Sequence, residues 1–266
     1  MQKTIFITGS TDGIGLETAK MLVSQGHYVL LHGRNASKLE AVKSSLSASG
    51  DCMEGYVADL SLMENVKALA NEVMQKHSTL DVLINNAGVY NAQNPMTEDE
   101  LDIRFAVNAI APYLLTQRLL PLLGPSGRVI NLSSAAQFPV ELDALTGQVS
   151  LSDRAAYAQS KLAITAWSRT LALSLQSGPA IIAVNPGSFL GTKMVKQAFG
   201  IAGGDIRKGA EILCRAALAN EFSEASGQYF DNDSGQFAAP HSDALNPEKA
   251  QEITDTIESV LAKITR

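Results

Sequence analysis

Tyr157 and Lys161 are two side chains whose spacing suits proton transfer. They lie four residues apart in a strongly helical stretch, so they share one face of the helix. An unperturbed phenol has a pKa of about 10, and a neighbouring ammonium lowers this pKa by favouring the phenolate. Such a tyrosine can give or take a proton near neutral pH. The same spacing is common by chance, and the alternative is an exposed pair on a helix.

A pair of serines at the end of a predicted strand is a second candidate for chemistry. Ser133 and Ser134 follow the apolar run Arg128–Leu132. In an open parallel sheet, ligands bind beyond the carboxyl ends of the strands. A hydroxyl at that position can hydrogen-bond a substrate carbonyl oxygen, whereas the alternative is a serine pair that caps a turn. The place of the pair in the sheet favours the functional interpretation.

Asn108 lies four residues before Pro112 inside a predicted helix. Proline has no N–H, so the Asn108 carbonyl loses its usual helical partner. A buried carbonyl needs another donor, and a bound water is one candidate. A catalytic water site and a simple helix kink are equally compatible with this pattern.

A glycine-rich turn joins the first predicted strand to the first predicted helix. The segment TGSTDGIG, residues 8–15, places Gly9, Gly13 and Gly15 in this turn. Glycine lets the backbone turn tightly and approach a pyrophosphate, and the helix N-terminus that follows attracts phosphate. The spacing differs from the GxGxxG of many other dinucleotide enzymes. Any tight turn can use glycine, but this strand–turn–helix context predicts a dinucleotide site.

The end of the second predicted strand indicates which dinucleotide fits. Enzymes that use NAD usually place an Asp or Glu there to bind the ribose 2′-hydroxyl. This chain instead has Gly33 followed by Arg34, and a guanidinium can bind a 2′-phosphate bidentately. Ser10 in the glycine-rich turn can add a hydrogen bond to that phosphate. The sign of the charge favours NADP(H), the alternative being that Arg34 is a solvated loop residue.

Two other strand ends carry small or polar residues that suit a cofactor. The segment Asn85-Asn86-Ala87-Gly88 closes the fourth predicted strand, and Pro186-Gly187 closes the sixth, with Thr192 shortly after. Small residues at such ends let a cofactor lie close to the backbone. Each of these signals is weak alone, because Asn and Gly commonly end strands.

These candidates need a scaffold of alternating strands and helices. The predicted strands are Thr4–Thr8, Tyr28–His32, Cys52–Ala58, Leu80–Asn85, Arg128–Leu132, Ile181–Val184 and Tyr229–Phe230. The predicted helices are Gly13–Gln25, Ala36–Ser47, Glu64–Lys76, Glu98–Leu122, Arg154–Gln176, Ile206–Ala219 and Pro247–Ile264. This alternation predicts an α/β domain, with a parallel sheet covered by helices on both faces.

Composition narrows the class of protein. The chain has 266 residues, a net charge of −6 and no basic run, so neither nucleic acid nor an anionic membrane surface is an expected partner. Cys52 and Cys214 lack the spacing of a metal site, and we expect two reduced thiols and no metal. The chain begins almost directly with an apolar strand and has no run long enough to span a bilayer, so we expect a cytoplasmic protein.

The order of these motifs resembles the short-chain dehydrogenase/reductase family. The resemblance extends from Thr8 to about Thr192. It rests on TGSTDGIG, Asp59-Leu60 after the third strand, NNAG, Asn108, the serine pair, Tyr157-x-x-x-Lys161 and Pro186-Gly187. It implies one Rossmann-type, doubly wound domain over residues 1–266, with a seven-stranded parallel sheet. It also implies an NADP(H)-dependent oxidoreductase that transfers a hydride between nicotinamide and a carbonyl or alcohol substrate.

The resemblance assigns roles to the candidate residues. Tyr157 is the general acid/base, Lys161 lowers its pKa and holds the nicotinamide ribose, Ser134 orients the carbonyl, and Asn108 holds a relay water. The implied cofactor contacts are Gly9, Gly13, Ile14 and Gly15 at the pyrophosphate, Asp59 and Leu60 at the adenine, Asn86 at the ribose, Ala87 and Gly88 beside it, Pro186 and Gly187, and Thr192 at the carboxamide.

Two departures from the common pattern matter. The segment between Ser134 and Tyr157 is long, which is similar to the retinol-dehydrogenase-like branch, and Thr192 comes one residue late. We expect substrate loops at residues 135–153 and 189–204, the second a mobile lid that ends in glycines. The expected apolar walls are Phe138, Val140, Leu190, Met194, Val195 and Phe199.

Two other functions remain open on this fold. A sensor or scaffold that binds NADP(H) without catalysis has no use for a positioned phenol at Tyr157. Epimerases or dehydratases of nucleotide sugars share the tetrad, but they usually carry a larger C-terminal substrate domain. The resemblance also implies a homodimer or homotetramer, formed through the two long helices Glu98–Leu122 and Arg154–Gln176.

Overall fold

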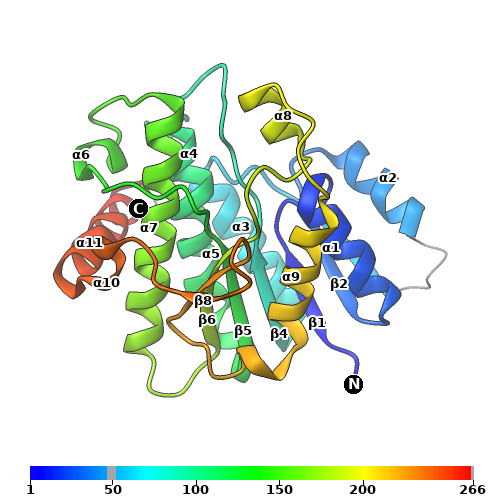
Figure 1. Cartoon of the computed structure of the whole chain (residues 1–266). Helices are drawn as coiled ribbons and strands as arrows, with labels where there is room; N and C mark the ends of the chain where they lie inside the picture. Colours follow the sequence, from blue (N-terminus) through cyan, green and yellow to red (C-terminus); the bar gives the residue numbers. More distant parts are fainter. Residues whose placement is uncertain (47–51, 265–266) are drawn as a thin grey trace.

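Eight strands form one sheet in the order β3-β2-β1-β4-β5-β6-β7-β8 (Figure 1). The computed structural model describes residues 1–46 and 52–264, so the predicted helix end at Ser47 and the end of the predicted domain lie outside it. The strands are β1 Thr4–Ile7, β2 Tyr28–Gly33, β3 Met53–Val57, β4 Leu80–Asn85, β5 Leu123–Leu132, β6 Ala180–Asn185, β7 Tyr229–Asp231 and β8 Gln236–Ala238. The first seven run parallel, and β8 pairs antiparallel with β7.

Helices cover both faces of this sheet (Figure 1). They are α1 Gly13–Ser24, α2 Ala36–Leu46, α3 Met63–Lys76, α4 Ile103–Phe105, α5 Ala111–Leu119, α6 Leu142–Leu145, α7 Asp153–Ser174, α8 Lys193–Phe199, α9 Arg207–Leu218, α10 Ser242–Leu245 and α11 Pro247–Ile264. A π-helical turn at Ala106–Ile110 joins α4 to α5.

The alternation of side chains along β1 explains the two layers of helices. Ile5 and Ile7 pack with α1, α2 and α9 on one face, whereas Phe6 packs with α3, α5 and α7 on the other. Successive side chains of a strand point to opposite faces, so an unbroken apolar strand needs cover on both. The predicted doubly wound fold is confirmed, with one strand more than expected. The additional strand, β8, returns from β7 through a turn in which Gly235 has a φ of 72°.

The predicted helix Glu98–Leu122 is wrong at its start. Helical structure begins at Ile103, because Glu100 has a φ of 59° and Asp102 caps the helix with its side chain. The π-helical turn then interrupts the helix four residues before Pro112, close to where a proline removes a helical hydrogen bond.

The C-terminal helix α11 packs against α7, one of the two helices through which we expected subunits to meet. In α7, every residue from Ala156 to Ala172 is buried or half-buried, and the same holds for Ala111–Leu119 in α5. Figure 1 shows α10 and α11 against α7, and Tyr113 of α5 is bonded to Glu258 of α11. The predicted subunit contact through these two helices stays a prediction, and α10 and α11 of the same chain pack against part of α7.

Across the described ranges, 1–46 and 52–264, no helix is both long enough and apolar enough to cross a bilayer.

Candidate active site

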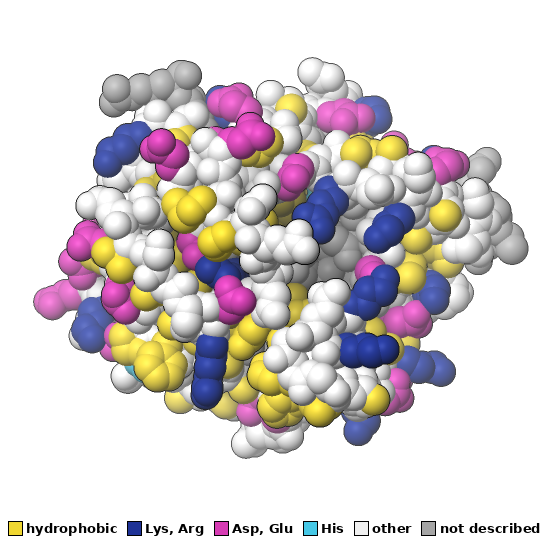
Figure 2. All heavy atoms as spheres, turned by 90° about the horizontal axis from the view of Figure 1, so that it is seen from above, with side chains coloured by type: hydrophobic (Ala, Val, Ile, Leu, Met, Phe, Trp, Pro, Cys, Tyr) yellow, Lys and Arg dark blue, Asp and Glu magenta, His cyan; other side chains and the backbone are white. Residues whose placement is uncertain are grey.

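A large cavity lies at the carboxyl ends of the parallel strands, where doubly wound sheets bind ligands. Its volume is about 1450 Å³. Figure 2 shows the hollow on this face, with Lys and Arg side chains along one side of it. The glycine-rich turn, the end of β2 and the segment after β4 form one part of the wall, and α7, α8 and the segment after β5 form the rest.

Tyr157 and Lys161 line this cavity from the first turns of α7. The Lys161 Nζ lies 5.6 Å from the centre of the Tyr157 ring and donates to the Leu132 carbonyl at 2.7 Å. Ser134 lines the same part, and its backbone carbonyl accepts from Gln137 Nε2 at 2.9 Å and from Tyr229 Oη at 3.2 Å. The predicted catalytic side chains of α7 and of the segment after β5 therefore meet at one cavity.

At the Tyr157 end of the cavity, the pKa of the phenol does not shift in the expected direction. Burial raises the pKa of Tyr157, although a hydrogen bond with the Ser134 side chain opposes the change. Burial also lowers the pKa of Lys161 to about 8, because the ammonium is almost fully enclosed. The direction of the Tyr157 shift is therefore opposite to the one expected, because desolvation, which disfavours the phenolate, is its largest cause. Burial at this position therefore favours the neutral phenol.

Asn108 lies behind the cavity wall, inside the π-helical turn. Its Oδ1 accepts from the Val89 N–H at 2.8 Å, and its Nδ2 donates to the Val89 carbonyl at 2.9 Å and to Ser160 Oγ at 3.0 Å. A Cβ placed on Gly88 would lie 3.5 Å from Asn108 Oδ1 and 3.8 Å from Lys161 Nζ. The structure thus brings Asn108 beside Lys161 and attaches it to α7.

The glycine-rich turn is shaped by close backbone contacts. Gly9 has a φ of 65°, and a Cβ on it would lie 2.9 Å from the Ala87 Cα. A Cβ on Gly15 would lie 2.3 Å from Asn86 Nδ2, which donates to the carbonyls of Thr8 and Gly9. Larger residues at Gly9 and Gly15 would push the turn away from the segment after β4, so the turn keeps its shape only with glycine there.

Ser10 and His32 hold this turn from behind. The Ser10 hydroxyl donates to the His32 carbonyl at 3.2 Å and accepts from its N–H at 2.8 Å. Ser10 is fully buried, which argues against the predicted contact with a 2′-phosphate. The His32 Nδ1 accepts from the Gly9 N–H at 3.0 Å, so the ring proton lies on Nε2, which donates to the Ala58 carbonyl at 3.1 Å.

Positive charge gathers where β2 ends. Arg34 and Lys38 both line the cavity, and Asn35 between them accepts from the Lys38 N–H at 2.9 Å, at the start of α2. A Cβ on Gly33 would lie 2.5 Å from Thr11 Cγ2, so the missing acid at this position leaves room for Thr11. Two cations and a helix N-terminus make this corner of the cavity suited to a phosphate group.

The opposite part of the cavity has aromatic walls. Tyr90 lies 4.8 Å from the Tyr157 ring and 5.5 Å from the Phe199 ring, measured between ring centres. Of the six predicted wall residues, Val140 packs against the core instead. The other five line the cavity, namely Phe138, Leu190, Met194, Val195 and Phe199. The α8 segment reaches across to the glycine-rich turn, where Lys193 pairs with Asp12.

Comparison with known proteins agrees with this geometry. A family model described as short chain dehydrogenase matches residues 3–200. The chain belongs to this family. Human retinol dehydrogenase 13 is 31% identical over 265 residues, which cover 91% of this chain and 80% of that protein. The predicted family and its retinol-dehydrogenase-like branch are both confirmed.

Solved structures share the fold. A protein from Mycobacterium paratuberculosis has a TM-score of 0.81 at 26% identity, covering 97% of this chain and 93% of that chain. A short chain dehydrogenase from Shigella flexneri 2a, crystallised with NADP, has a TM-score of 0.69 at 29% identity, covering 86% of this chain and 96% of that chain.

Most residues predicted for the site of this short chain dehydrogenase lie in the cavity wall. They are Gly9, Gly13, Ile14, Arg34, Asp59, Leu60, Asn86, Ala87, Gly88, Ser134, Tyr157, Lys161, Pro186, Gly187 and Thr192. Asn108, Ser10 and Gly15 are buried behind the wall. Thr192 uses its hydroxyl to cap α8, where it accepts from the Val195 N–H at 3.2 Å.

Several cavity residues of this short chain dehydrogenase were missed from the sequence. They are Thr11, His32, Asn35, Lys38, Tyr90 and Arg154. Lys38 was detectable, because it lies one helical turn after Arg34 at the start of a predicted helix. Nothing in the pattern marked Tyr90, which reaches the cavity through the path of the segment after β4. Within the described residues, no group of His, Cys, Asp and Glu is arranged to hold a metal ion.

The buried histidine makes the stability of this short chain dehydrogenase depend on pH. Burial lowers the pKa of His32 from 6.5 to about 4, so the unfolded chain binds a proton before the folded one does. Stability is then complete above the unfolded pKa and falls as pH drops from 6.5 toward 4, by about 3 kcal/mol in all. Urea unfolding at several pH values measures this loss.

The His32→Asn variant provides the comparison. It should be less stable near neutral pH, but it should lose less stability on acidification than the wild type, because it cannot take up this proton. His241→Asn, at a histidine that caps α10, is the matched control and should follow the wild type. Equal losses in the wild type and in His32→Asn would show that other groups cause the acid sensitivity.

Proposed function

We propose that this protein is an NADP(H)-dependent oxidoreductase that reduces an apolar carbonyl compound, with Tyr157 as the proton donor. One observation carries the proposal. The phenol of Tyr157, the hydroxyl of Ser134 and the ammonium of Lys161 line one end of a cavity whose other end presents Arg34. A dinucleotide that places its phosphate at Arg34 has room to extend toward Tyr157.

The residues at the Arg34 end of the cavity fit NADP(H). Gly9 and Gly13 form an open turn before the N-terminus of α1, which suits a pyrophosphate. Arg34 and Lys38 offer positive charge to a 2′-phosphate, and no acid follows β2 to repel it. The related dehydrogenase crystallised with NADP supports the same choice. When bound, the cofactor supplies the hydride, while the protein supplies position and electrostatics.

The residues at the Tyr157 end of the cavity have distinct tasks. Tyr157 holds a proton for the oxygen that gains negative charge, because burial keeps the phenol neutral. Ser134 is placed to hydrogen-bond the same oxygen, and the Gln137 and Tyr229 bonds to its carbonyl hold its backbone. Lys161 is anchored by the Leu132 carbonyl, so its charge stays beside the phenol. A neutral phenol suits carbonyl reduction, in which the developing alkoxide takes up a proton.

The walls indicate an apolar substrate. Tyr90, Phe199 and Phe138 present aromatic surface to the cavity, and Met194 and Val195 add aliphatic surface from α8. Such walls gain free energy by covering apolar surface of a ligand. The retinol dehydrogenase similarity supports an apolar alcohol or carbonyl. We propose that residues 189–204 act as a lid over this end, held to the glycine-rich turn by the Lys193–Asp12 pair.

A screen of carbonyl compounds with purified protein tests this function. Consumption of NADPH is followed by absorbance, with NADH as the control for cofactor choice and small charged carbonyls as the control for substrate class. We expect turnover of apolar aldehydes or ketones with NADPH. Binding of NADPH without turnover of any compound would favour a sensor or scaffold, and turnover of small charged carbonyls alone would contradict the apolar pocket.

A further inference from the structure

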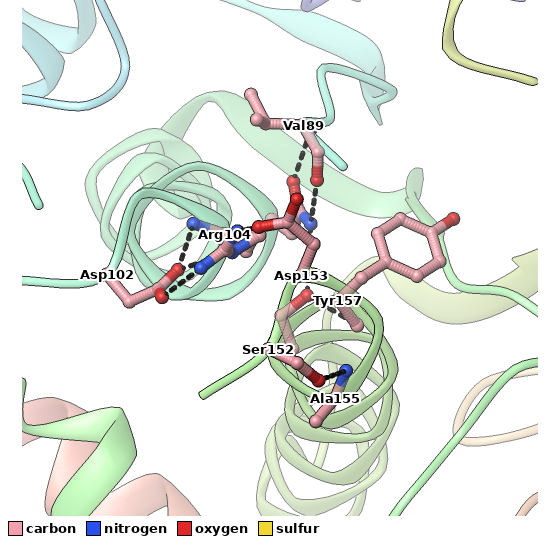
Figure 3. Close-up of polar contacts among 9 residues, drawn as sticks. Val89, Asp102, Arg104, Ser152, Asp153, Ala155 and Tyr157 are labelled. Carbon is pink, nitrogen blue, oxygen red and sulfur yellow. Dashed lines mark hydrogen bonds and ion pairs between the residues drawn. The ribbon is translucent and has the colours of Figure 1, made fainter. Parts of the chain in front are cut away.

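Arg104 is a fully buried cation between the two segments that carry the catalytic groups. It belongs to α4, directly before the π-helical turn of Asn108, and its exposed fraction is 1%. Figure 3 shows its guanidinium between Asp102 on its own segment and Asp153, the first residue of α7. Its Nε donates to Asp102 Oδ1 at 2.8 Å, and its other two nitrogens reach Asp102 and Asp153.

The two carboxylates differ in their surroundings. Asp102 is buried and also caps α4 by accepting from the Arg104 N–H at 2.8 Å, whereas the Asp153 side chain is half exposed. Burial lowers the pKa of Arg104, but both carboxylates oppose this and hold it above its ordinary value, so the cation persists. A buried ion pair contributes little net stability, because desolvation offsets the attraction between its charges. Its contribution is orientation, because a planar guanidinium group binds carboxylates in only a few geometries.

The ion pair between Arg104 and Asp153 lies one helical turn from Tyr157, the proposed proton donor. Asp153 precedes Tyr157 by four residues, so the two residues lie one turn apart on the same side of α7. A second link follows further along α7, where Ser160 Oγ accepts from Asn108 Nδ2 at 3.0 Å and donates to the Tyr157 carbonyl at 2.7 Å. Figure 3 shows the Tyr157 hydroxyl pointing away from Arg104 and Asp153. The backbone of Tyr157 is thus held from one side while its phenol reaches the cavity.

We propose that Arg104 is a positioning residue, which sets the first turn of α7, and with it Tyr157, against the Asn108 segment. This inference rests on the proposed function, in which Tyr157 donates the proton. The N-cap of α7 is Ser152, whose hydroxyl accepts from the Ala155 N–H, so Asp153 is not the capping residue. On this proposal the contact between Asp153 and Arg104 serves the placement of α7.

The informative variant is Asp153→Ala. Arg104→Met leaves Asp102 as a buried charge without its partner and is expected to misfold, whereas Asp153→Ala keeps the Arg104–Asp102 pair intact. Asp153→Asn keeps an oxygen that can accept from Arg104 and is the conservative variant. Glu64→Ala is the matched control, because Glu64 is a first-turn acid of α3 whose partner is Lys67, away from the cavity.

Two measurements decide the proposal. Well below the melting temperature, Asp153→Ala should lower kcat by about tenfold and raise the solvent isotope effect on kcat, with the NADPH dissociation constant unchanged. Asp153→Asn should recover part of the rate, and Glu64→Ala should match the wild type. In parallel, hydrogen exchange should show faster exchange of the α7 amides around residues 156–161, but not of the sheet.

Each outcome bears on the proposal. Unchanged exchange in α7, or faster exchange with unchanged kcat, would overturn it, because the ion pair would then not place Tyr157. A wild type that turns over no carbonyl compound would overturn the proposed function instead. The exchange measurement would still show whether Arg104 holds α7.

Discussion

Replacing Tyr157 by Phe is expected to lower kcat/KM for carbonyl reduction by about 10²–10⁴-fold. The change removes one hydroxyl from a half-buried side chain, and the ring keeps its contact with Tyr90. The loss follows from chemistry, because the variant lacks the hydroxyl that we propose gives the oxygen its proton, while Ser134 remains to hydrogen-bond that oxygen. Steady-state rates with NADPH and the best carbonyl compound measure the effect.

Cofactor binding separates this effect from a loss of structure. The dissociation constant for NADPH should change less than about threefold, because the Arg34 end of the cavity is untouched. Tyr56→Phe is the matched control, since Tyr56 lies on β3 and its hydroxyl bonds Glu54. Full activity in Tyr157→Phe would end the assignment of this phenol as proton donor, and equal losses in both variants would indicate a general defect of folding.

Replacing Arg34 by Ala is expected to raise KM for NADPH by about 10–100-fold and to leave KM for NADH nearly unchanged. A hydrogen bond to a charged group contributes about 1.5–3 kcal/mol, and each 1.4 kcal/mol is about a factor of ten in affinity. NADH lacks the 2′-phosphate, so it does not lose this contact. The ratio of kcat/KM for the two cofactors measures the change in preference.

The neighbouring residues define the controls for this prediction. Lys38→Ala should have a smaller effect of the same kind, whereas Arg118→Ala on α5 removes a cation elsewhere and should have none. Introducing an acid at Gly33 is a poor test, because its Cβ would lie 2.5 Å from Thr11 Cγ2 and would disturb the turn itself. An unchanged cofactor ratio in Arg34→Ala would refute the assignment of the 2′-phosphate to this corner.

Local patterns were enough to predict the layers of the fold and most of the cavity wall. Apolar strands that need cover on both faces, glycines at a strand–helix turn and the Tyr157–Lys161 spacing are properties of neighbouring residues. These residues were predicted to lie together because parallel strands have their carboxyl ends at the same edge of a sheet. The same reasoning missed β8 and misplaced the start of the helix before Asn108, because a short hairpin and a left-handed Glu100 leave no periodic signal.

Contacts between distant segments determined the remainder. The sequence indicated that a phenol stands beside an ammonium, but desolvation at this place in the fold raises the pKa of Tyr157 and lowers the pKa of Lys161. Ser10 carries a hydroxyl in a glycine-rich turn, but β2 lies behind the turn and this hydroxyl hydrogen-bonds the backbone of His32. Arg104 meets Asp153 across 49 residues of chain, and α11 covers α7 across a longer distance. Burial and partners of this kind depend on which segments pack together, so local sequence specifies the groups and packing specifies their charge and position.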